Sequence, residues 1–199
     1  FPSGGILMCV GQRPSHMGRV VAVCGMPGSG KGEFAAVLAQ QGVPVLSMGD
    51  MVRAEVRSQE LEETPGIFGE IAAQLRAEFG EDVLAVRLAD AVDSLLLEHP
   101  IVLIEGMRGT AERTVFHARW SNDFASLAVD ASPGVRFTRI QLRGRSEDGD
   151  RAAFEVRDQR EIGWGLDKII LEADHLIDNN QDLESFRLAC QEWYRQYEG

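Results

Sequence analysis

The sequence is short of lysine and of net positive charge. Only two of its 199 residues are lysine, Lys31 and Lys168, against eighteen arginines, and the formal net charge is −11. An extended basic face is the usual electrostatic footprint of a nucleic-acid-binding protein, so this balance disfavours such a partner. The sequence also has no basic stripe interleaved with aromatic residues. We therefore expect no nucleic-acid partner.

Long apolar runs and metal-binding cysteine patterns are missing as well. No stretch approaches the roughly eighteen apolar residues that a membrane-spanning helix needs. The three cysteines, Cys9, Cys24 and Cys190, have no metal-ligand spacing, which favours reduced thiols in a cytosolic protein. Residues 1–18 do not resemble an export signal. These observations predict no membrane partner, a cytoplasmic location, and a flexible leader or extension over 1–18.

The most informative feature present is a glycine loop between a predicted strand and a predicted helix. Residues 20–24 are apolar, and residues 34–38 have the spacing of a helix face. Between them, glycines allow positive φ angles that turn backbone N–H groups inward around a polyphosphate, and Lys31 adds a mobile positive charge. This order is the context that a phosphate-binding loop requires. The candidate nucleotide-binding residues are Gly25, Met26, Pro27, Gly28, Ser29, Gly30, Lys31, Gly32 and Glu33, with Asn179 later in the chain.

The position after the lysine departs from the usual loop pattern. Such loops normally place Ser or Thr there, whose hydroxyl coordinates Mg²⁺, whereas this chain has Gly32 followed by Glu33. The metal must then be held through water or by a carboxylate from elsewhere in the site. Glu105, at the end of a predicted buried strand, is either this metal-side carboxylate or the partner of a nearby arginine.

Strands and helices alternate along the chain. Short apolar segments at 20–24, 43–47, 101–104, 124–129 and 175–177 predict five strands, and helical patterns separate them, including a long one over 64–98 that breaks near Gly80. This alternation predicts one α/β domain over 19–199, in which a five-stranded parallel sheet is covered on both faces. Ligands bind such sheets at the carboxyl ends of the strands. That edge would carry the glycine loop, Asp50, Glu105, Asp130 and Asn179.

Several charged residues are placed to handle a phosphoryl group. Its transfer needs charge neutralisation and alignment more than covalent chemistry. Arg53 and Arg108 follow the ends of two strands, where planar donors could clamp an acceptor phosphate at two points. Asp50 is either a helix N-cap or a base that receives the acceptor proton. A later helix carries Arg136, Arg139, Arg143 and Arg145; each alone fits a solvated helix face, and we expect two or three of them in the site.

These motifs resemble the nucleoside monophosphate kinase group of phosphate-loop kinases. The glycine loop and residues 47–53, Ser-Met-Gly-Asp-Met-Val-Arg, look like adenylate kinase signatures. From about Arg19 to Tyr197 the chain is similar to an archaeal family of adenylate-kinase-related and dephospho-coenzyme A kinase-like proteins of the UPF0200 type. The segments that carry this similarity are 42–50, 104–108, 143–146, 157–161, 173–174 and 177–179.

The resemblance implies a three-layer α/β/α P-loop NTPase fold that binds ATP and Mg²⁺. It further implies small acceptor-site helices over about 49–80 and a short arginine-bearing lid over about 143–162. Asp50, Arg53, Arg108 and Arg157 would bind the acceptor. Members usually carry Asp where this chain has Glu105, and Thr or Ser beside the lysine, so both departures concern the metal. The expected catalytic residues are Lys31, Arg108, Arg143, Arg145 and Asp50.

The expected function is ATP-dependent phosphoryl transfer to a nucleotide or nucleotide-like small molecule by a monomer or homodimer. The alternative is a nucleotide-binding switch whose slow ATP hydrolysis signals to a protein partner. The switch hypothesis predicts a contiguous exposed apolar patch outside the cleft, and ATPase activity that no small molecule stimulates.

Overall fold

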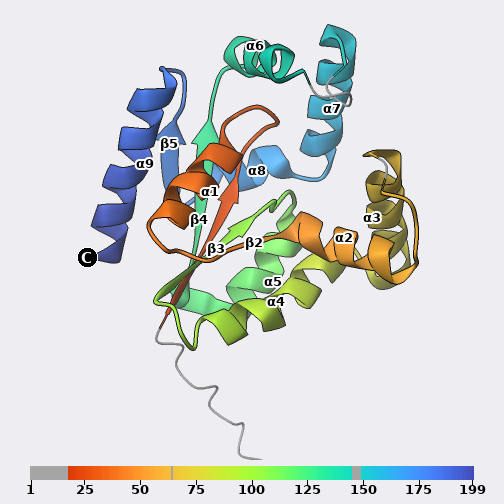
Figure 1. Ribbon diagram of the computed structural model, residues 1–199, viewed down its shortest axis with the longest axis horizontal. Coiled ribbons are helices and arrows are strands. Elements are labelled where there is room, and N and C mark those ends of the chain that lie inside the picture. Colours follow the sequence, from red (N-terminus) through yellow and green to blue (C-terminus); the bar gives the residue numbers. More distant parts are fainter. Residues whose placement is uncertain (1–17, 64, 145–148) are drawn as a thin grey trace, which may run out of the picture.

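A five-stranded, wholly parallel sheet organises the computed structural model, which describes residues 18–63, 65–144 and 149–199 (Figure 1). The strand order is β2-β3-β1-β4-β5, and every neighbouring pair is parallel. The predicted five-stranded parallel sheet is therefore confirmed, while the leader expected over 1–18 lies outside the described residues apart from Gly18. The strands are β1 Arg19–Cys24, β2 Val45–Ser47, β3 Ile101–Glu105, β4 Phe124–Asp130 and β5 His175–Asp178.

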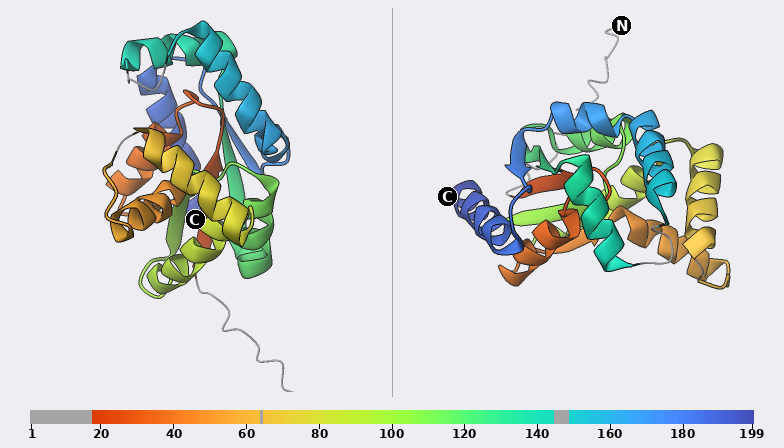
Figure 2. Two further views of the ribbon diagram at one scale, coloured as in Figure 1. Left: turned by 90° about the vertical axis from the view of Figure 1, so that its right-hand side faces the viewer. Right: turned by 90° about the horizontal axis from the view of Figure 1, so that it is seen from above.

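Helices connect the strands and cover both faces of the sheet (Figures 1 and 2). The helical pattern over 64–98 gives two helices, and the break falls at Gly80, whose φ of 104° is in the left-handed region. The six-residue helix α8 is not among the predicted elements. The helices are α1 Lys31–Gln40, α2 Met48–Ser58, α3 Pro65–Phe79, α4 Val83–Leu95, α5 Thr110–Trp120, α6 Pro133–Arg143, α7 Arg151–Gly163, α8 Leu166–Leu171 and α9 Leu183–Glu198, with a 3-10 turn at Ser121–Asp123.

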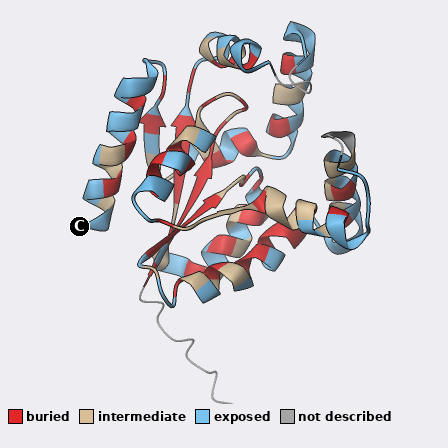
Figure 3. Ribbon diagram, viewed as in Figure 1, coloured by how far each residue is buried: buried red, intermediate tan, exposed pale blue. Residues whose placement is uncertain are grey.

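Alternate residues of β1 enter two separate hydrophobic cores. Val20 and Ala22 pack into a core formed with helices that include α4, α5 and α8, while Val21 and Val23 pack into another with α1 and α9. Successive side chains of a strand point to opposite faces, so a central strand covered on both faces must be apolar throughout. Figure 3 shows this buried central sheet between its helical layers. The three-layer α/β/α arrangement follows.

The carboxyl ends of the strands form one edge of the sheet, and two helical segments approach it. Helices α2 and α3 lie on one side, and α6 and α7 lie above the glycine loop (Figure 1). The end of α7 also reaches α3, because the guanidinium of Arg76 lies 5.6 Å from the centre of the Trp164 ring. In the described residues, no helix is long and apolar enough to cross a membrane.

Candidate functional site

The loop between β1 and α1 requires glycine at its tightest points. Gly25 has a φ of 154°, and a Cβ there would lie 2.4 Å from the carbonyl oxygen of Val129. Gly30 has a φ of 111°, and its Cβ would lie 2.3 Å from Nδ2 of Asn179. Both the backbone angle and the lack of space exclude other residues. The loop thus takes the tightly wound form that the sequence predicts.

Lys31 is the first residue of α1 and folds back over its own loop. Its Nζ donates to the carbonyl oxygens of Gly25, at 2.6 Å, and Met26, at 3.2 Å. Burial, together with the positive charge of Arg108, lowers the pKa of Lys31 from 10.5 to about 8, while the nearby Glu161 and Glu105 oppose the shift. An ammonium group in this environment gains from an incoming anion, because the anion would offset its desolvation.

Two further groups of the loop fit a polyphosphate. The Ser29 hydroxyl is fully buried and has no hydrogen-bond partner among the described residues. A buried polar group without a partner is costly, so its presence favours a ligand oxygen at this place. Asn179, just after β5, donates from Nδ2 to the carbonyl oxygen of Ser29 at 2.7 Å. Asn179 therefore supports the loop backbone in this structure.

Arg136 corrects the expectation of a solvated helix face. It is only 3% exposed, forms an ion pair with Asp158 of α7 and donates to the Pro27 carbonyl oxygen at 3.0 Å. A third bond reaches the Ala131 carbonyl oxygen. The four candidate arginines look equivalent in sequence, but the packing of α6 turns this one inward. Arg136 braces the glycine loop against α6 and α7.

Arg139, another of the four candidate arginines, lies beside the glycine loop. Its Nη2 donates to Oδ1 of Asn179 and to the carbonyl oxygen of Gln181, both at 3.2 Å. Its Nη1 is buried without a hydrogen-bond partner among the described residues, and desolvation lowers its pKa. The guanidinium thus lies beside the glycine loop with a donor still to be satisfied. Only the orientation of α6 distinguishes it from its neighbours.

Glu105 lies where the sequence lacks the usual metal-binding hydroxyl. Its Oε1 lies 3.8 Å from the position that a Cβ on Gly32 would occupy. The carboxylate therefore approaches the space that a Ser or Thr side chain would fill in the usual pattern. Among the described residues, no group of three or more His, Cys, Asp or Glu side chains could hold a metal. Mg²⁺ commonly takes only one or two carboxylates and completes its shell with water and phosphate oxygens, so one glutamate is sufficient.

Asp50 is not the N-cap of α2, which corrects one of its two expected roles. Ser47 is the N-cap, and its hydroxyl accepts from the backbone N–H of Gly49. Asp50 is the third helical residue and completes a capping box by accepting from the backbone N–H of Ser47 at 3.3 Å. Its other oxygen accepts two bonds from Arg53. Both side chains remain about half exposed.

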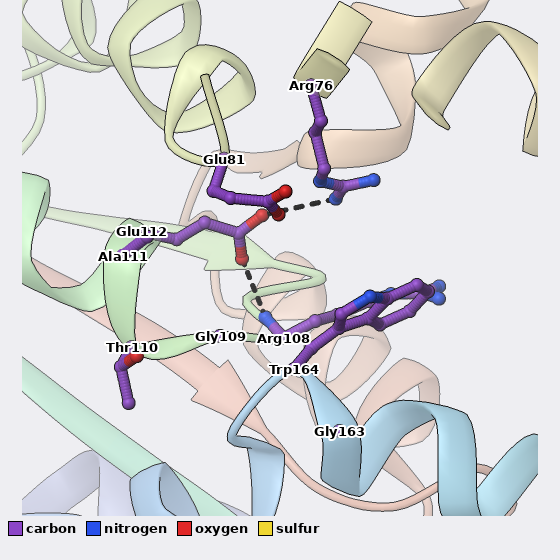
Figure 4. A pocket seen from close by; sticks show the side chains of 9 residues that line it. All are labelled: Arg76, Glu81, Arg108, Gly109, Thr110, Ala111, Glu112, Gly163 and Trp164. Atoms are coloured by element: carbon purple, nitrogen blue, oxygen red, sulfur yellow. Dashed lines mark hydrogen bonds and ion pairs between the residues drawn. The ribbon is translucent and has the colours of Figure 1, made fainter. Parts of the chain in front are cut away.

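A cavity of about 280 Å³ lies between α3, the loop from β3 to α5, and the end of α7 (Figure 4). Arg108, whose predicted role is to bind the acceptor, is part of the lining; the second arginine there is Arg76 of α3, and Arg53 is not in the lining. Trp164 forms part of the wall. The full lining is Arg76, Glu81, Arg108, Gly109, Thr110, Ala111, Glu112, Gly163 and Trp164.

Buried glutamates hold both cavity arginines. Arg108 donates from Nη1 to Oε1 of Glu161 at 2.9 Å, and its backbone N–H donates to Oε2 of Glu112 at 2.8 Å. Arg76 donates to the other oxygen of Glu112 at 3.3 Å. Burial raises the pKa of Glu112, while the backbone N–H of Arg108 and the charged side chains of Arg76 and Arg108 oppose that shift. The guanidinium groups are thus fixed at the cavity wall by charged hydrogen bonds.

The remaining predicted arginines are Arg143, Arg145 and Arg157. Arg143 is the last residue of α6, and Arg157 lies partly buried on α7. Arg145 lies outside the described residues. Arg160, on the same helix as Arg157, lies 5.6 Å from the centre of the Trp164 ring. The end of α7 therefore brings an aromatic ring and cations toward the cavity.

The fold and the glycine loop define a P-loop protein, and comparison with known proteins agrees. The family model described as AAA domain (AAA_17) matches residues 24–156. A UPF0200 protein of Hyperthermus butylicus is 40% identical over 168 residues, covering 84% of this chain and 88% of the relative. The chain belongs to the UPF0200 family. A UPF0200/UPF0201 protein of Archaeoglobus fulgidus is 37% identical over 169 residues, and the match spans 84% of this chain but only 52% of that longer relative.

Solved structures support the fold at lower identity. TT1252 from Thermus thermophilus superposes with a TM-score of 0.62 at 21% identity, covering 92% of this chain and 99% of that one. Shikimate kinase from Acinetobacter baumannii, in complex with shikimate, gives a TM-score of 0.56 at 14% identity over 90% of this chain and 93% of the kinase. The three-layer architecture is thus shared with these proteins, one of which is a kinase.

Proposed function

We propose that this protein is an ATP-dependent phosphotransferase that acts on a nucleotide or nucleotide-like small molecule. The observation that carries the proposal is the loop over 25–32, where Lys31 is held by loop carbonyl groups and the buried Ser29 hydroxyl has no hydrogen-bond partner in the described structure. Kinase relatives in fold support the same reaction class. Buried free thiols at Cys24 and Cys190 support a reducing, cytoplasmic location. Either a monomer or a homodimer is compatible with this proposal.

Each part of the site has a proposed role: the glycine loop, the acceptor side and the lid. The loop amides from Gly25 to Glu33 and Lys31 hold the phosphates of ATP, while Asn179 supports the loop from behind. Arg108 on the acceptor side and Arg143, Arg145 and Arg157 in the lid region stabilise charge on the transferring group. The short lid over about 143–162 closes over that group. In the same proposal, Asp50 and Arg53 lie on the acceptor side, where Asp50 is the base.

Glu105 is proposed to hold the magnesium ion, directly or through water. A bound magnesium ion would supply positive charge to offset that of the phosphates. The residues present fit it, because the Glu105 carboxylate approaches the position left empty by Gly32. The glutamate then replaces the missing hydroxyl as the ligand on the protein side.

The two lysines of the chain provide a test variant and a matched control. Titration calorimetry with MgATP should give binding for the wild type and a large loss for Lys31→Ala, while Lys168→Ala, at an exposed position on α8, should bind normally. ADP formation should require both Mg²⁺ and an acceptor across a panel of nucleosides, nucleoside monophosphates and dephospho-coenzyme A. If the folded protein takes up no MgATP at millimolar concentration, the proposal is wrong.

A nucleotide-dependent switch is the second candidate. An apolar groove of about 290 Å³ between α4 and α5 supports it, since Val86 there is 52% exposed and Ala89, Val115 and Ala118 complete the lining with Arg119. This groove is the kind of exposed apolar surface that the switch hypothesis predicts. If no small molecule in the panel increases the rate of ATP hydrolysis, the result would favour the switch over the kinase.

A further inference from the structure

The cavity lined by Arg76 and Arg108 is the proposed acceptor site, and we call it the acceptor cavity. Its lining has no net positive charge. Its lining contains two arginines and two glutamates, so the formal charge is zero. The two arginines of the lining, and Arg53 of the predicted acceptor side, are each already bound to a carboxylate of the protein. The pairs are Arg53 with Asp50, Arg76 with Glu112, and Arg108 with Glu161.

Two of these carboxylates cannot turn toward water. Glu112 and Glu161 are 3% and 2% exposed, and each is held in place by an arginine of the cavity wall. A phosphate acceptor with two negative charges would lie close to these buried carboxylates and compete with them for the arginine charges, in a cavity whose formal charge is zero. A neutral acceptor avoids this cost, since it leaves both ion pairs intact.

Hydrogen bonds and an aromatic surface remain available to such a molecule. A guanidinium has five N–H donors, and the glutamate bonds use only one on Arg76 and one on the Arg108 side chain. The Trp164 side chain, 37% exposed, forms part of the cavity wall (Figure 4). Aromatic surface of this kind suits the face of a ring, and the neighbouring donors suit hydroxyl and carbonyl oxygens.

We propose that the acceptor is an uncharged, hydroxyl-bearing ring compound of the nucleoside class, and that its phosphorylated group is an alcohol. This inference rests on the proposed function and chooses among its possible acceptors. The acceptor hydroxyl oxygen forms a bond to the γ-phosphorus of ATP, and the bond from that phosphorus to the β,γ-bridging oxygen breaks. The bridging electron pair leaves with ADP. The hydroxyl proton passes to the carboxylate of Asp50.

An alcohol needs a base to accept its proton, whereas the attacking oxygen of a phosphate acceptor is already ionised. The position and exposure of Asp50 suit the role of this base. Its position is fixed by the capping bond from the Ser47 N–H and by Arg53, yet its side chain is still 48% exposed. Ser47 lies opposite Glu105 in the sheet, and a Cβ on Gly106 would lie 3.6 Å from Cβ of Met48, so the first turn of α2, which carries Asp50, lies next to the end of β3. The base and the metal side of the reaction then meet at one edge of the sheet.

Binding distinguishes the two acceptor types directly. Each of four common ribonucleosides and its 5′-monophosphate would be titrated into protein saturated with a magnesium complex of a non-hydrolysable ATP analogue. We expect at least one nucleoside to bind about tenfold tighter than its monophosphate. Phosphorus NMR of the turnover mixture should then show a new phosphomonoester and no new phosphoanhydride other than ADP.

Removing a cavity carboxylate should shift this preference. Glu112→Gln leaves Arg76 without its ion pair and should improve monophosphate binding by about tenfold, while Glu78→Gln, on the exposed face of α3, should not change it. If the buried substitution prevents folding, Glu81→Gln removes a charge from the exposed rim of the same cavity and should shift the preference in the same direction.

The base is tested separately. Asp50→Asn should lower kcat by about 100-fold or more while nucleoside binding is unchanged, since only proton acceptance is lost. Glu98→Gln serves as control, because it also replaces a carboxylate by an amide, at an exposed position before the start of β3. Full kcat in Asp50→Asn would remove the proposed base and overturn the alcohol mechanism.

The remaining outcomes separate this inference from the proposed function. Tighter binding of monophosphates than of nucleosides, or no nucleoside binding at millimolar concentration in protein that binds MgATP, overturns the neutral acceptor and leaves the kinase proposal standing. Failure to bind MgATP overturns both.

Discussion

Substituting Arg136 by methionine tests whether the glycine loop depends on its brace. Methionine keeps much of the side-chain volume against Phe154, whose ring centre lies 4.9 Å from the guanidinium carbon. It removes the ion pair to Asp158, whose side chain is only 14% exposed, and the hydrogen bonds to Pro27 and Ala131. The buried carboxylate is then left without compensation.

The expected loss is large for a single substitution. Breaking a buried ion pair by removing one partner costs about 3–5 kcal/mol of unfolding free energy. For a domain of this size, about 2–4 °C of melting temperature is lost per kcal/mol, which gives a decrease of about 6–20 °C. MgATP binding should weaken as well, because the Pro27 carbonyl belongs to the loop that holds the phosphates.

Urea unfolding followed by circular dichroism measures this loss. Arg151→Met is the matched control, since Arg151 stacks on the same Phe154 ring but its ion pair with Glu155 is exposed and should contribute less than about 1 kcal/mol. The double variant Arg136→Met/Asp158→Leu should recover much of the stability by removing the stranded charge. A loss below about 1 kcal/mol in Arg136→Met, within the range of exposed pairs, would refute the reasoning.

The other predictions concern the loop and its lysine. The pKa of Lys31 is lowered from 10.5 to about 8, so MgATP affinity should fall as pH rises through about 8, and Lys31→Arg should remove that pH dependence. Between about pH 8 and 10.5, Lys31 binds more protons in the unfolded state than in the folded state, so its contribution to the free energy of unfolding increases as the pH rises. Lys31→Met should therefore flatten that part of a plot of the free energy of unfolding against pH. Gly30→Ala should abolish MgATP binding in calorimetry, because its Cβ would clash with Asn179 in a backbone conformation that alanine rarely adopts. Gly32→Ser has room beside Glu105 and should lower the Mg²⁺ concentration needed for half-maximal ADP formation; an unchanged requirement would argue against magnesium at this position.

The fold was predictable because its signals are local and redundant. The central strands are continuous apolar runs, Gly80 interrupts a long helical pattern, and the glycine loop has its strand and helix on either side. Helix α8 escaped prediction because six residues contain less than two turns, and such a segment shows no clear period.

The candidate site was predictable only where a residue follows a strand. Lys31 follows the loop after β1, Glu105 is the last residue of β3 and Arg108 comes shortly after it, so the parallel sheet alone brings them to one edge. Arg76 lies near the end of a fifteen-residue helix, and its part in the cavity depends on how α3 packs. Likewise, only the rotation of α6 decides that Arg136 is buried and that Arg139 reaches Asn179. Tertiary packing of this kind leaves no local pattern.

The hydrogen bond from Asn179 to Ser29 joins residues 150 positions apart, and this separation bears on how the protein is made. A ribosome adds about 5–20 residues per second, so the two bonded residues leave it at least several seconds apart. During that interval the nascent β1-α1 unit has neither its edge strand nor the amide that supports its tightest turn. The glycine loop therefore reaches its supported form only after β5 has been made and has joined the sheet.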